Sequence, residues 1–139
     1  MKHNLSYMKI NIPISVGELV DKITILEIKS IMISDKAKLV EVENEKIQLT
    51  KEFQKISSAK LSKSQLFALK ADLYETNLRL WHIEDNIRKC ERNKNFDAEF
   101  VRLARGVYQA NDMRFSIKNN INKLTNSDIK EVKSYESYS

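Results

Sequence analysis

The chain has 139 residues, enough for one domain, and is 42% hydrophobic and 31% charged with only two Gly and one Pro. Strands and tight turns need Gly and Pro, whereas long helices exclude both, so the composition favours an all-α fold. The net charge of +5 is interspersed with acidic residues, a pattern typical of solvated helix faces rather than of a nucleic-acid-binding arm. The single cysteine, Cys90, excludes an internal disulfide and a cysteine-based zinc site.

The N-terminal part is expected to be extended. Residues 1–7 form an extension without a hydrophobic pattern, and Met8 to Ile14 alternates between apolar and polar residues, which predicts one short strand. A lone strand has no partner in a helical chain. It either lies as a strap on the helices or pairs with its copy in another subunit.

Four helices are predicted to follow. Ser15 and Glu18 have the spacing of a capping box and start the first helix, which continues to about residue 33. The other three are predicted at about 35–56, 64–92 and 97–124, followed by a polar tail at 125–139. A single helical domain therefore covers residues 8–124.

The later helices carry the strongest pattern, with apolar residues spaced alternately three and four apart. This spacing is typical of coiled-coil packing, and the short connection between the third and fourth helices predicts an antiparallel hairpin. The first helix is apolar on more than one side and is expected to be central. The predicted architecture is an antiparallel bundle of four helices, built as two long helical hairpins. The seam residues of the last two helices are Leu66, Leu69, Leu73, Thr76, Leu80, Ile83, Ile87 and Cys90, then Phe96, Phe100, Leu103, Val107, Ala110, Arg114, Ile117, Ile121 and Leu124.

Two charges fall on apolar helix faces. Glu27 lies in the middle of the stripe on the first helix, and Arg114 lies on the seam of the fourth. Because an unpaired buried ion costs several kcal/mol, we predict that Glu27 and Arg114 form a buried ion pair.

Other polar residues beside these seams would complete a pocket. All six arginines lie between Arg79 and Arg114 in a chain with 18 lysines, and only arginine offers a planar fork for bidentate contacts. The pocket could hold a small anionic or zwitterionic ligand, or the same residues could be an ion-pair network that fixes helix register. The candidate ligand-binding residues are Glu27, Trp81, Glu84, Arg88, Asn111 and Arg114.

A second polar stripe lies on the far side of the fourth helix. It is either a solvated face or a surface for a protein partner, since Arg and Tyr are favoured in interface hot spots. Its members are Arg102, Arg105, Tyr108 and Asp112.

Evidence for catalysis is sparse. Glu18 and Asp21 share a helix face, as do carboxylate pairs in metal-dependent all-α nucleotide pyrophosphatases, but such enzymes need a second acidic pair, and only Glu84-Asp85 could supply it. Glycine-rich phosphate loops, nucleophile elbows and metal-ligand spacings are missing from the sequence. We therefore expect neither a metal site nor a cofactor, and no residue is assigned a catalytic role.

Several stretches resemble a family of uncharacterised bacterial and phage-borne proteins, DUF6165. They are Ile12 to Lys29, Leu80 to Asp85, Phe96 to Arg114 and Lys133 to Tyr135. The resemblance covers Met8 to about Tyr138 and implies a context of surface-polysaccharide synthesis, without an activity. The chain also has a looser similarity to helical chorismate mutases. It departs from them because its first helix lacks the cationic residues that those enzymes place on their first long helix.

From these observations we expect a cytoplasmic, non-catalytic helical accessory or scaffold protein, a homodimer that acts through protein–protein contacts. The most apolar stretch, residues 23–33, contains Glu27 and Lys29 and is too short to span a membrane. The alternative is a small helical-bundle enzyme or binding protein for a small anionic ligand such as a sugar nucleotide, a sugar phosphate or a carboxylate.

Overall fold

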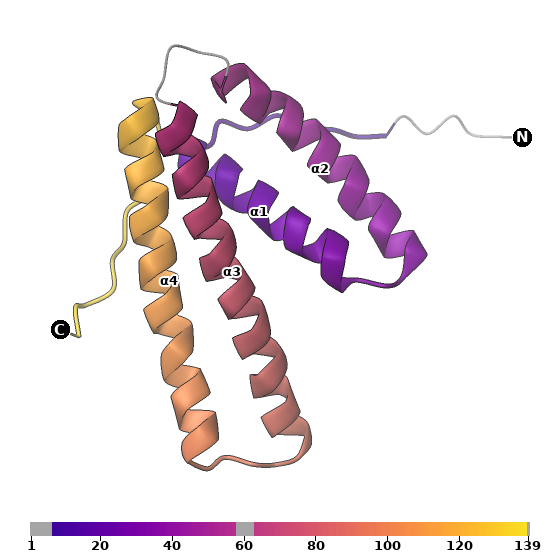
Figure 1. Ribbon diagram of the computed structural model, residues 1–139, viewed down its shortest axis with the longest axis vertical. Coiled ribbons are helices and arrows are strands. Elements are labelled where there is room, and N and C mark those ends of the chain that lie inside the picture. Colours follow the sequence, from indigo (N-terminus) through magenta and orange to yellow (C-terminus); the bar gives the residue numbers. More distant parts are fainter. Residues whose placement is uncertain (1–6, 58–62, 139) are drawn as a thin grey trace, which may run out of the picture.

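The computed structural model describes residues 7–57 and 63–138, which form four α-helices between extended terminal segments (Figure 1). The helices are α1 (Val16–Met32), α2 (Lys36–Ser57), α3 (Lys63–Arg92) and α4 (Ala98–Thr125). They pack against each other as an all-α bundle, which confirms the predicted fold class. Within the described residues, no helix has both the length and the apolar character needed to cross a membrane.

Local side chains explain where helices begin and end. Ser15 Oγ accepts a hydrogen bond from the backbone N–H of Glu18 at 3.0 Å, and Asp97 Oδ1 accepts one from Glu99 at 3.0 Å. Each satisfies a backbone donor that the first turn of a helix leaves free. α4 ends where Asn126 adopts a left-handed backbone with φ of 52°, a conformation that asparagine tolerates better than most residues.

α1 is the central helix, as predicted from its broad apolar surface. It packs against α2, α3 and α4, whereas α2 packs mainly on α1. α3 and α4 form the longest contact, an antiparallel hairpin whose far half projects beyond α1 and α2 (Figure 1). The molecule therefore has a four-helix part, where α1 meets every other helix, and a projecting two-helix part.

The hydrophobic core follows the predicted seams. In the four-helix part, residues from all four helices form one cluster, and in the projecting hairpin a smaller cluster lies between α3 and α4. Phe96 is an exception because it precedes α4 and stays 52% exposed. Cys90 is a buried free thiol in the smaller cluster. The larger cluster contains Leu19, Val20, Ile23, Phe53, Leu66, Leu73, Ile117 and Ile121.

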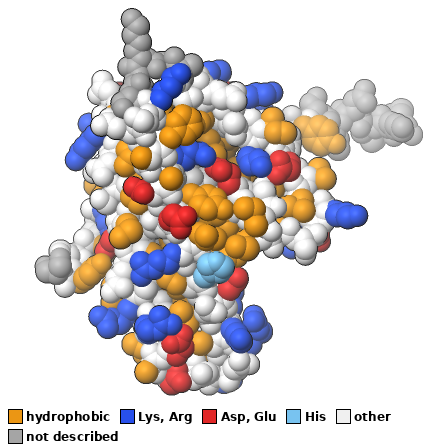
Figure 2. Space-filling view, in the orientation of Figure 1, with side chains coloured by type: hydrophobic (Ala, Val, Ile, Leu, Met, Phe, Trp, Pro, Cys, Tyr) orange, Lys and Arg blue, Asp and Glu red, His pale blue; other side chains and the backbone are white. Residues whose placement is uncertain are grey.

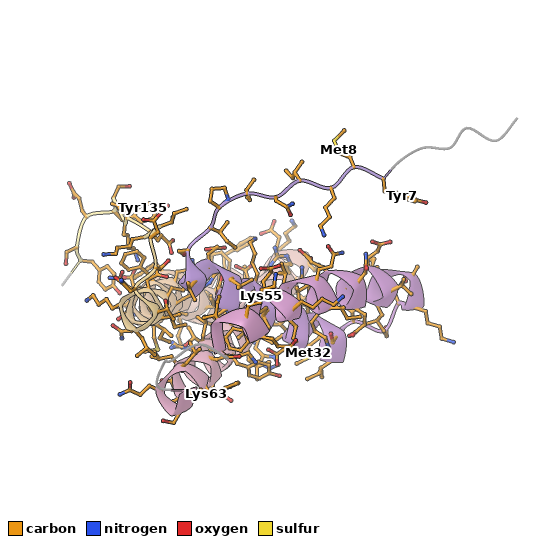
Figure 3. The ribbon with its side chains drawn as sticks, turned by 90° about the horizontal axis from the view of Figure 1, so that it is seen from above. Tyr7, Met8, Met32, Lys55, Lys63 and Tyr135 are labelled. Carbon is orange, nitrogen blue, oxygen red and sulfur yellow. The ribbon has the colours of Figure 1, made fainter. Side chains whose placement is uncertain are left out.

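The short N-terminal strand is not formed. Residues 7–15 are extended, but the described part of the chain contains no strand, because a single extended segment has no second one to complete a ladder. The segment instead passes over α1 and α2 and leads away from them towards Met8 and Tyr7 (Figure 3). Its Ile10 and Ile12 are 74% and 66% exposed.

Candidate functional site

The fully buried carboxylate of Asp21 on α1 is the centre of a polar network between α1, α3 and α4. Arg114 of α4 binds both of its oxygens, with Nε 2.8 Å from Oδ1 and Nη2 2.5 Å from Oδ2. Asn77 of α3 donates from Nδ2 to Asp21 Oδ1 and to Thr24 Oγ1, both at 2.9 Å. A bidentate ion pair with an added hydrogen bond offsets much of the cost of burying this carboxylate.

The predicted ion pair between Glu27 and Arg114 is wrong. Glu27 Oε1 lies 2.8 Å from Lys70 Nζ of α3, and Arg114 pairs with Asp21. Glu27 itself lies among residues of α2 and α3, whereas Arg114 of α4 meets the side of α1 that carries Asp21. The sequence did carry a signal for that side, in buried residues spaced four, three and four apart. They are Gly17, Asp21, Thr24 and Ile28.

Lys118 of α4 is a buried cation that the sequence analysis did not identify. Its side chain is 6% exposed, and Nζ lies 2.7 Å from Glu18 of α1 and 2.7 Å from Glu131 of the C-terminal tail. Burial lowers the pKa of the Lys118 ammonium, but the hydrogen bonds to Glu131 and Glu18 and the attraction of the nearby carboxylate charges together outweigh burial and hold this pKa above its ordinary value. Lys118 thereby joins α1 and the tail to α4.

The N-terminus of α1 is also bound by groups from the end of α4. The backbone N–H of Val16 donates to Ser127 Oγ at 3.1 Å, and that of Gly17 donates to Asn122 Oδ1 at 2.7 Å. Gly17 permits this approach because a Cβ atom there would lie 2.5 Å from the backbone oxygen of Lys118. A glycine is therefore required at the point where α1 crosses α4.

A cavity of about 290 Å³ lies beside the Asp21–Arg114 pair, between α1, α3 and α4. Arg114 uses Nε and Nη2 for Asp21, and its Nη1 makes no hydrogen bond within residues 7–57 and 63–138. Glu27 lies elsewhere, against Lys70, and Arg88 does not line the cavity but pairs with Glu84 at its edge. The structure thus brings together four of the candidate ligand residues around this cavity, and they are Trp81, Glu84, Asn111 and Arg114.

Two members of the predicted stripe on α4 contact the C-terminal tail, and the other two form contacts within α4. Asp112 forms an ion pair with Lys133 of the C-terminal tail, and Tyr108 stacks edge-on against Tyr138 at 5.1 Å between ring centroids. Since Lys118 contacts Glu131, successive tail residues contact successively earlier residues of α4, and the tail runs back along that helix. The other two members of the stripe form hydrogen bonds within α4: Arg102 binds Glu99, and Arg105 donates to Tyr108 at 3.4 Å.

The chemistry available to this network is limited by its own contacts. The Asp21 carboxylate accepts three hydrogen bonds, and Glu18 is held by Lys118 and Lys22, so the two carboxylates have separate partners. In the part of the chain that the structure describes, no group of three His, Cys, Asp or Glu side chains could hold a metal ion. The network therefore fits a structural role or the recognition of a ligand by Arg114 better than it fits acid–base catalysis.

Comparison of the chain with curated proteins and with solved structures found no match. A family model does match, over residues 8–138. These residues include all four helices, the N-terminal segment from Met8 and the tail that binds α4. The chain therefore belongs to a family of unknown function, DUF6165.

Proposed function

We propose that this protein is a non-catalytic helical accessory protein that acts through protein–protein contacts and forms a homodimer. The observation that carries the proposal is a contrast between its interior and its N-terminal surface. The buried ions Asp21 and Lys118 are paired within the chain. The hydrophobic side chains of Met8, Ile10 and Ile12 are 92%, 74% and 66% exposed.

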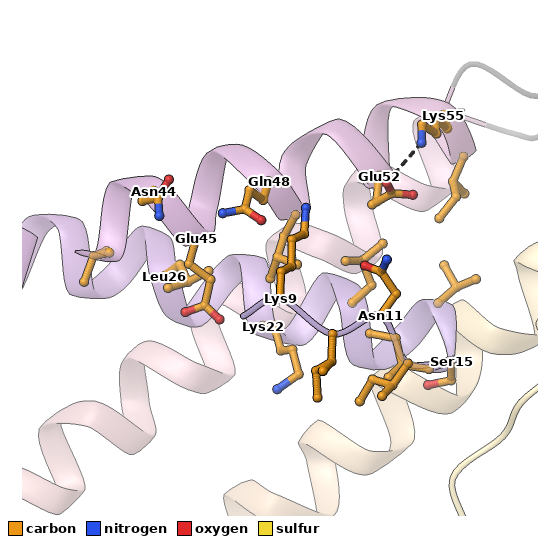
Figure 4. Close-up of a pocket in the computed structure, with 18 of the residues that line it drawn as sticks. Lys9, Asn11, Ser15, Lys22, Leu26, Asn44, Glu45, Gln48, Glu52 and Lys55 are labelled. Carbon is orange, nitrogen blue, oxygen red and sulfur yellow. Dashed lines mark hydrogen bonds and ion pairs between the residues drawn. The ribbon is translucent and has the colours of Figure 1, made fainter. Parts of the chain in front are cut away.

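Two of these exposed side chains, Ile10 and Ile12, line a large groove between α1 and α2. The groove has a volume of about 1050 Å³, and the N-terminal segment with Lys9 and Asn11 crosses it (Figure 4). Because Ile10 and Ile12 line the groove but remain largely exposed, the segment does not fill it. A protein surface that covers both the segment and the groove would bury apolar area, and each Å² of apolar surface buried would stabilise the complex by about 25 cal/mol.

The partner that best fits this surface is a second copy of the chain. The α1 edge of the groove contributes two lysines, Lys22 and Lys29, and the α2 edge contributes three glutamates and one lysine, Lys55, which pairs with one of them. A two-fold axis through the groove places the basic edge of one copy opposite the acidic edge of the other, and an interface of this kind must be self-complementary. Among the described residues, the backbone of residues 7–14 forms no hydrogen bond with other backbone groups, and a second copy of the segment can supply such bonds as an antiparallel strand. The acidic residues of the α2 edge are Glu41, Glu45 and Glu52.

The test is the mass of the full chain in solution, measured by light scattering during size-exclusion chromatography. We expect a dimer at micromolar concentration, and a monomer when Ile10 and Ile12 are both changed to Asp. The matched control is Val132→Asp, because Val132 is 87% exposed on the C-terminal tail and lies outside the groove. A wild-type chain that stays monomeric, or a control that dissociates as fully as the double variant, would refute the dimer.

A second candidate function is the binding of a small anionic ligand in the cavity beside Arg114. The observation that favours it is Nη1 of Arg114, which remains available next to Trp81 and Asn111. A thermal-shift screen of carboxylic acids, sugar phosphates and sugar nucleotides tests it, since a ligand at about 100 times its dissociation constant adds about 2.7 kcal/mol to the stability. Ligands that leave the melting temperature unchanged would remove this candidate.

A setting in surface-polysaccharide synthesis is proposed from the family resemblance alone.

A further inference from the structure

The projecting half of the hairpin has a groove on the face opposite the Asp21–Arg114 cavity. The cavity is lined by Asn77, Trp81 and Glu84 on α3, and the groove by residues about half a helical turn away, such as Arg79 and His82. The groove has a volume of about 510 Å³, within the range of small-molecule sites. It is separate from the α1–α2 groove proposed for dimerisation.

Arginine is concentrated on this face. Arg79 and Arg102 line the groove, and an adjoining depression on α4 is lined by Arg102 and Arg105, so that three of the six arginines of the chain meet here. The chain otherwise uses lysine as its main cation, with 18 residues. Arginine differs from lysine in presenting a rigid fork of donors that matches phosphate and carboxylate oxygens.

Two of these guanidinium groups form no ion pair with a carboxylate of the described residues. Arg102 binds Glu99 through Nε and Nη2, whereas neither Arg79 nor Arg105 forms an ion pair within the described ranges, 7–57 and 63–138. The other carboxylate at the groove is Glu75. The face therefore keeps a positive excess.

The floor of the groove is apolar. Leu78 and Ile83 of α3 and Leu103 of α4 line it together with Gly106. A ligand here can place an anionic group on the arginines and a carbon skeleton on the floor. His82 and Gln109 add polar groups at the margin.

We propose that this groove binds the phosphate ester of a small organic molecule, with the phosphoryl group held by Arg79, Arg102 and Arg105. A carboxylate has two oxygens and is satisfied by one guanidinium fork, whereas a phosphoryl group has three terminal oxygens and can accept from several. Several arginines around one groove therefore favour phosphate over carboxylate. The apolar floor favours an ester over inorganic phosphate.

Phenyl phosphate and inorganic phosphate, titrated into the full chain by calorimetry at constant ionic strength, test the proposal. We expect phenyl phosphate to bind more tightly, because its ring covers the apolar floor. Changing both Arg79 and Arg105 to Gln is expected to weaken binding by at least about tenfold, since a hydrogen bond to a charged group contributes about 1.5–3 kcal/mol. The control is Arg92→Gln, an exposed arginine of α3 that does not line the groove, and it should change the affinity less than about twofold.

A second pair of variants distinguishes a shaped site from simple charge attraction. Changing Arg79 and Arg105 to Lys keeps both charges and removes the forks, so these variants should also bind more weakly than the wild type. Lysine variants that bind as well as the wild type, or an Arg92→Gln variant that is weakened as much as the double glutamine variant, would overturn the proposal. Phenyl phosphate that shows no binding at millimolar concentration, or an oligonucleotide that binds tighter and depends equally on Arg92, would overturn it too. Figure 2 shows how Lys and Arg side chains spread over the projecting hairpin, which is why the Arg92 control is needed.

Discussion

Gly17 provides a direct test of how α1 is held against α4. In an ordinary helix interior, replacing Gly by Ala stabilises the helix by about 1 kcal/mol, because alanine has the higher helix propensity. At Gly17 the structure predicts the opposite sign. The added Cβ would lie 2.5 Å from the backbone oxygen of Lys118 and 2.9 Å from Asn122 Oδ1.

The magnitude follows from what must move. The nearest atom belongs to the backbone of α4, so α1 and α4 have to separate, and overpacking of this kind costs about 1–3 kcal/mol. Separation also weakens the 2.7 Å hydrogen bond from the Gly17 N–H to Asn122, which adds about 0.5–1.5 kcal/mol. After the gain in helix propensity, Gly17→Ala should lower the free energy of unfolding by about 1–3 kcal/mol.

Gly106 supplies the matched control. It is also a buried helical glycine, but a Cβ there would lie 3.1 Å from Cδ1 of Ile83, the far end of a flexible side chain. Ile83 can adjust, so Gly106→Ala should leave the stability within about 1 kcal/mol of the wild type, on the favourable side if propensity dominates. Both variants are compared by urea unfolding followed by far-UV circular dichroism. If Gly17→Ala is as stable as Gly106→Ala, α1 and α4 do not cross as closely as the 2.5 Å approach requires.

Three further predictions concern the polar contacts of α4. Arg114→Met should destabilise the protein by about 3–5 kcal/mol, because the buried carboxylate of Asp21 loses its partner. Asp21→Leu combined with Arg114→Met should recover about half of that loss or more. Urea unfolding of the single and double variants measures both losses of stability, and equal losses would contradict the pairing. Because the pKa of Lys118 is raised on folding, its ion pairs stabilise the protein fully below its ordinary pKa of 10.5, and this stabilisation is lost as the pH rises through the higher folded-state pKa. Above pH 10.5 the wild type should therefore lose stability more steeply than Lys118→Met. Parallel profiles of unfolding free energy against pH would argue against a charged Lys118. Ser127→Ala removes the acceptor for the Val16 N–H and should cost about 1 kcal/mol in the same assay, typical of a lost N-terminal cap, while no change would mean that water replaces the hydroxyl.

Much of the fold could be predicted because it depends on local chemistry. The caps at Ser15 and Asp97 are formed by side chains within three residues of the donors that they satisfy. The alternating three- and four-residue spacing of apolar residues in α3 and α4 depends only on helix geometry. The N-terminal segment lies over the helices as an extended strap, one of the two arrangements expected, because strand formation needs a partner segment that its own alternating pattern cannot supply.

The candidate site could be predicted only in part. Trp81, Glu84, Asn111 and Arg114 do line one cavity, because the seams that they flank face each other. The partner of Arg114 was assigned wrongly because a helical wheel gives the angle of each side chain about its own axis and not which neighbour lies there. Lys118 was missed because its two carboxylate partners are not its neighbours in the helix: Glu18 of α1 lies 100 positions before it and Glu131 of the tail lies 13 positions after it.

The sequence by itself determined that this protein is helical, where its helices begin and end, and that charges on apolar faces must be paired, since periodicity, capping and the cost of burying an ion are properties of short stretches of chain. Only the tertiary structure decided that Asp21 rather than Glu27 meets Arg114, that Gly17 marks a helix crossing, and that Arg79 and Arg102 line one groove beside the depression that Arg105 lines. These facts depend on how α1 is rotated and placed against the α3–α4 hairpin. That placement results from packing three faces of one helix at once, which no single helix pattern specifies.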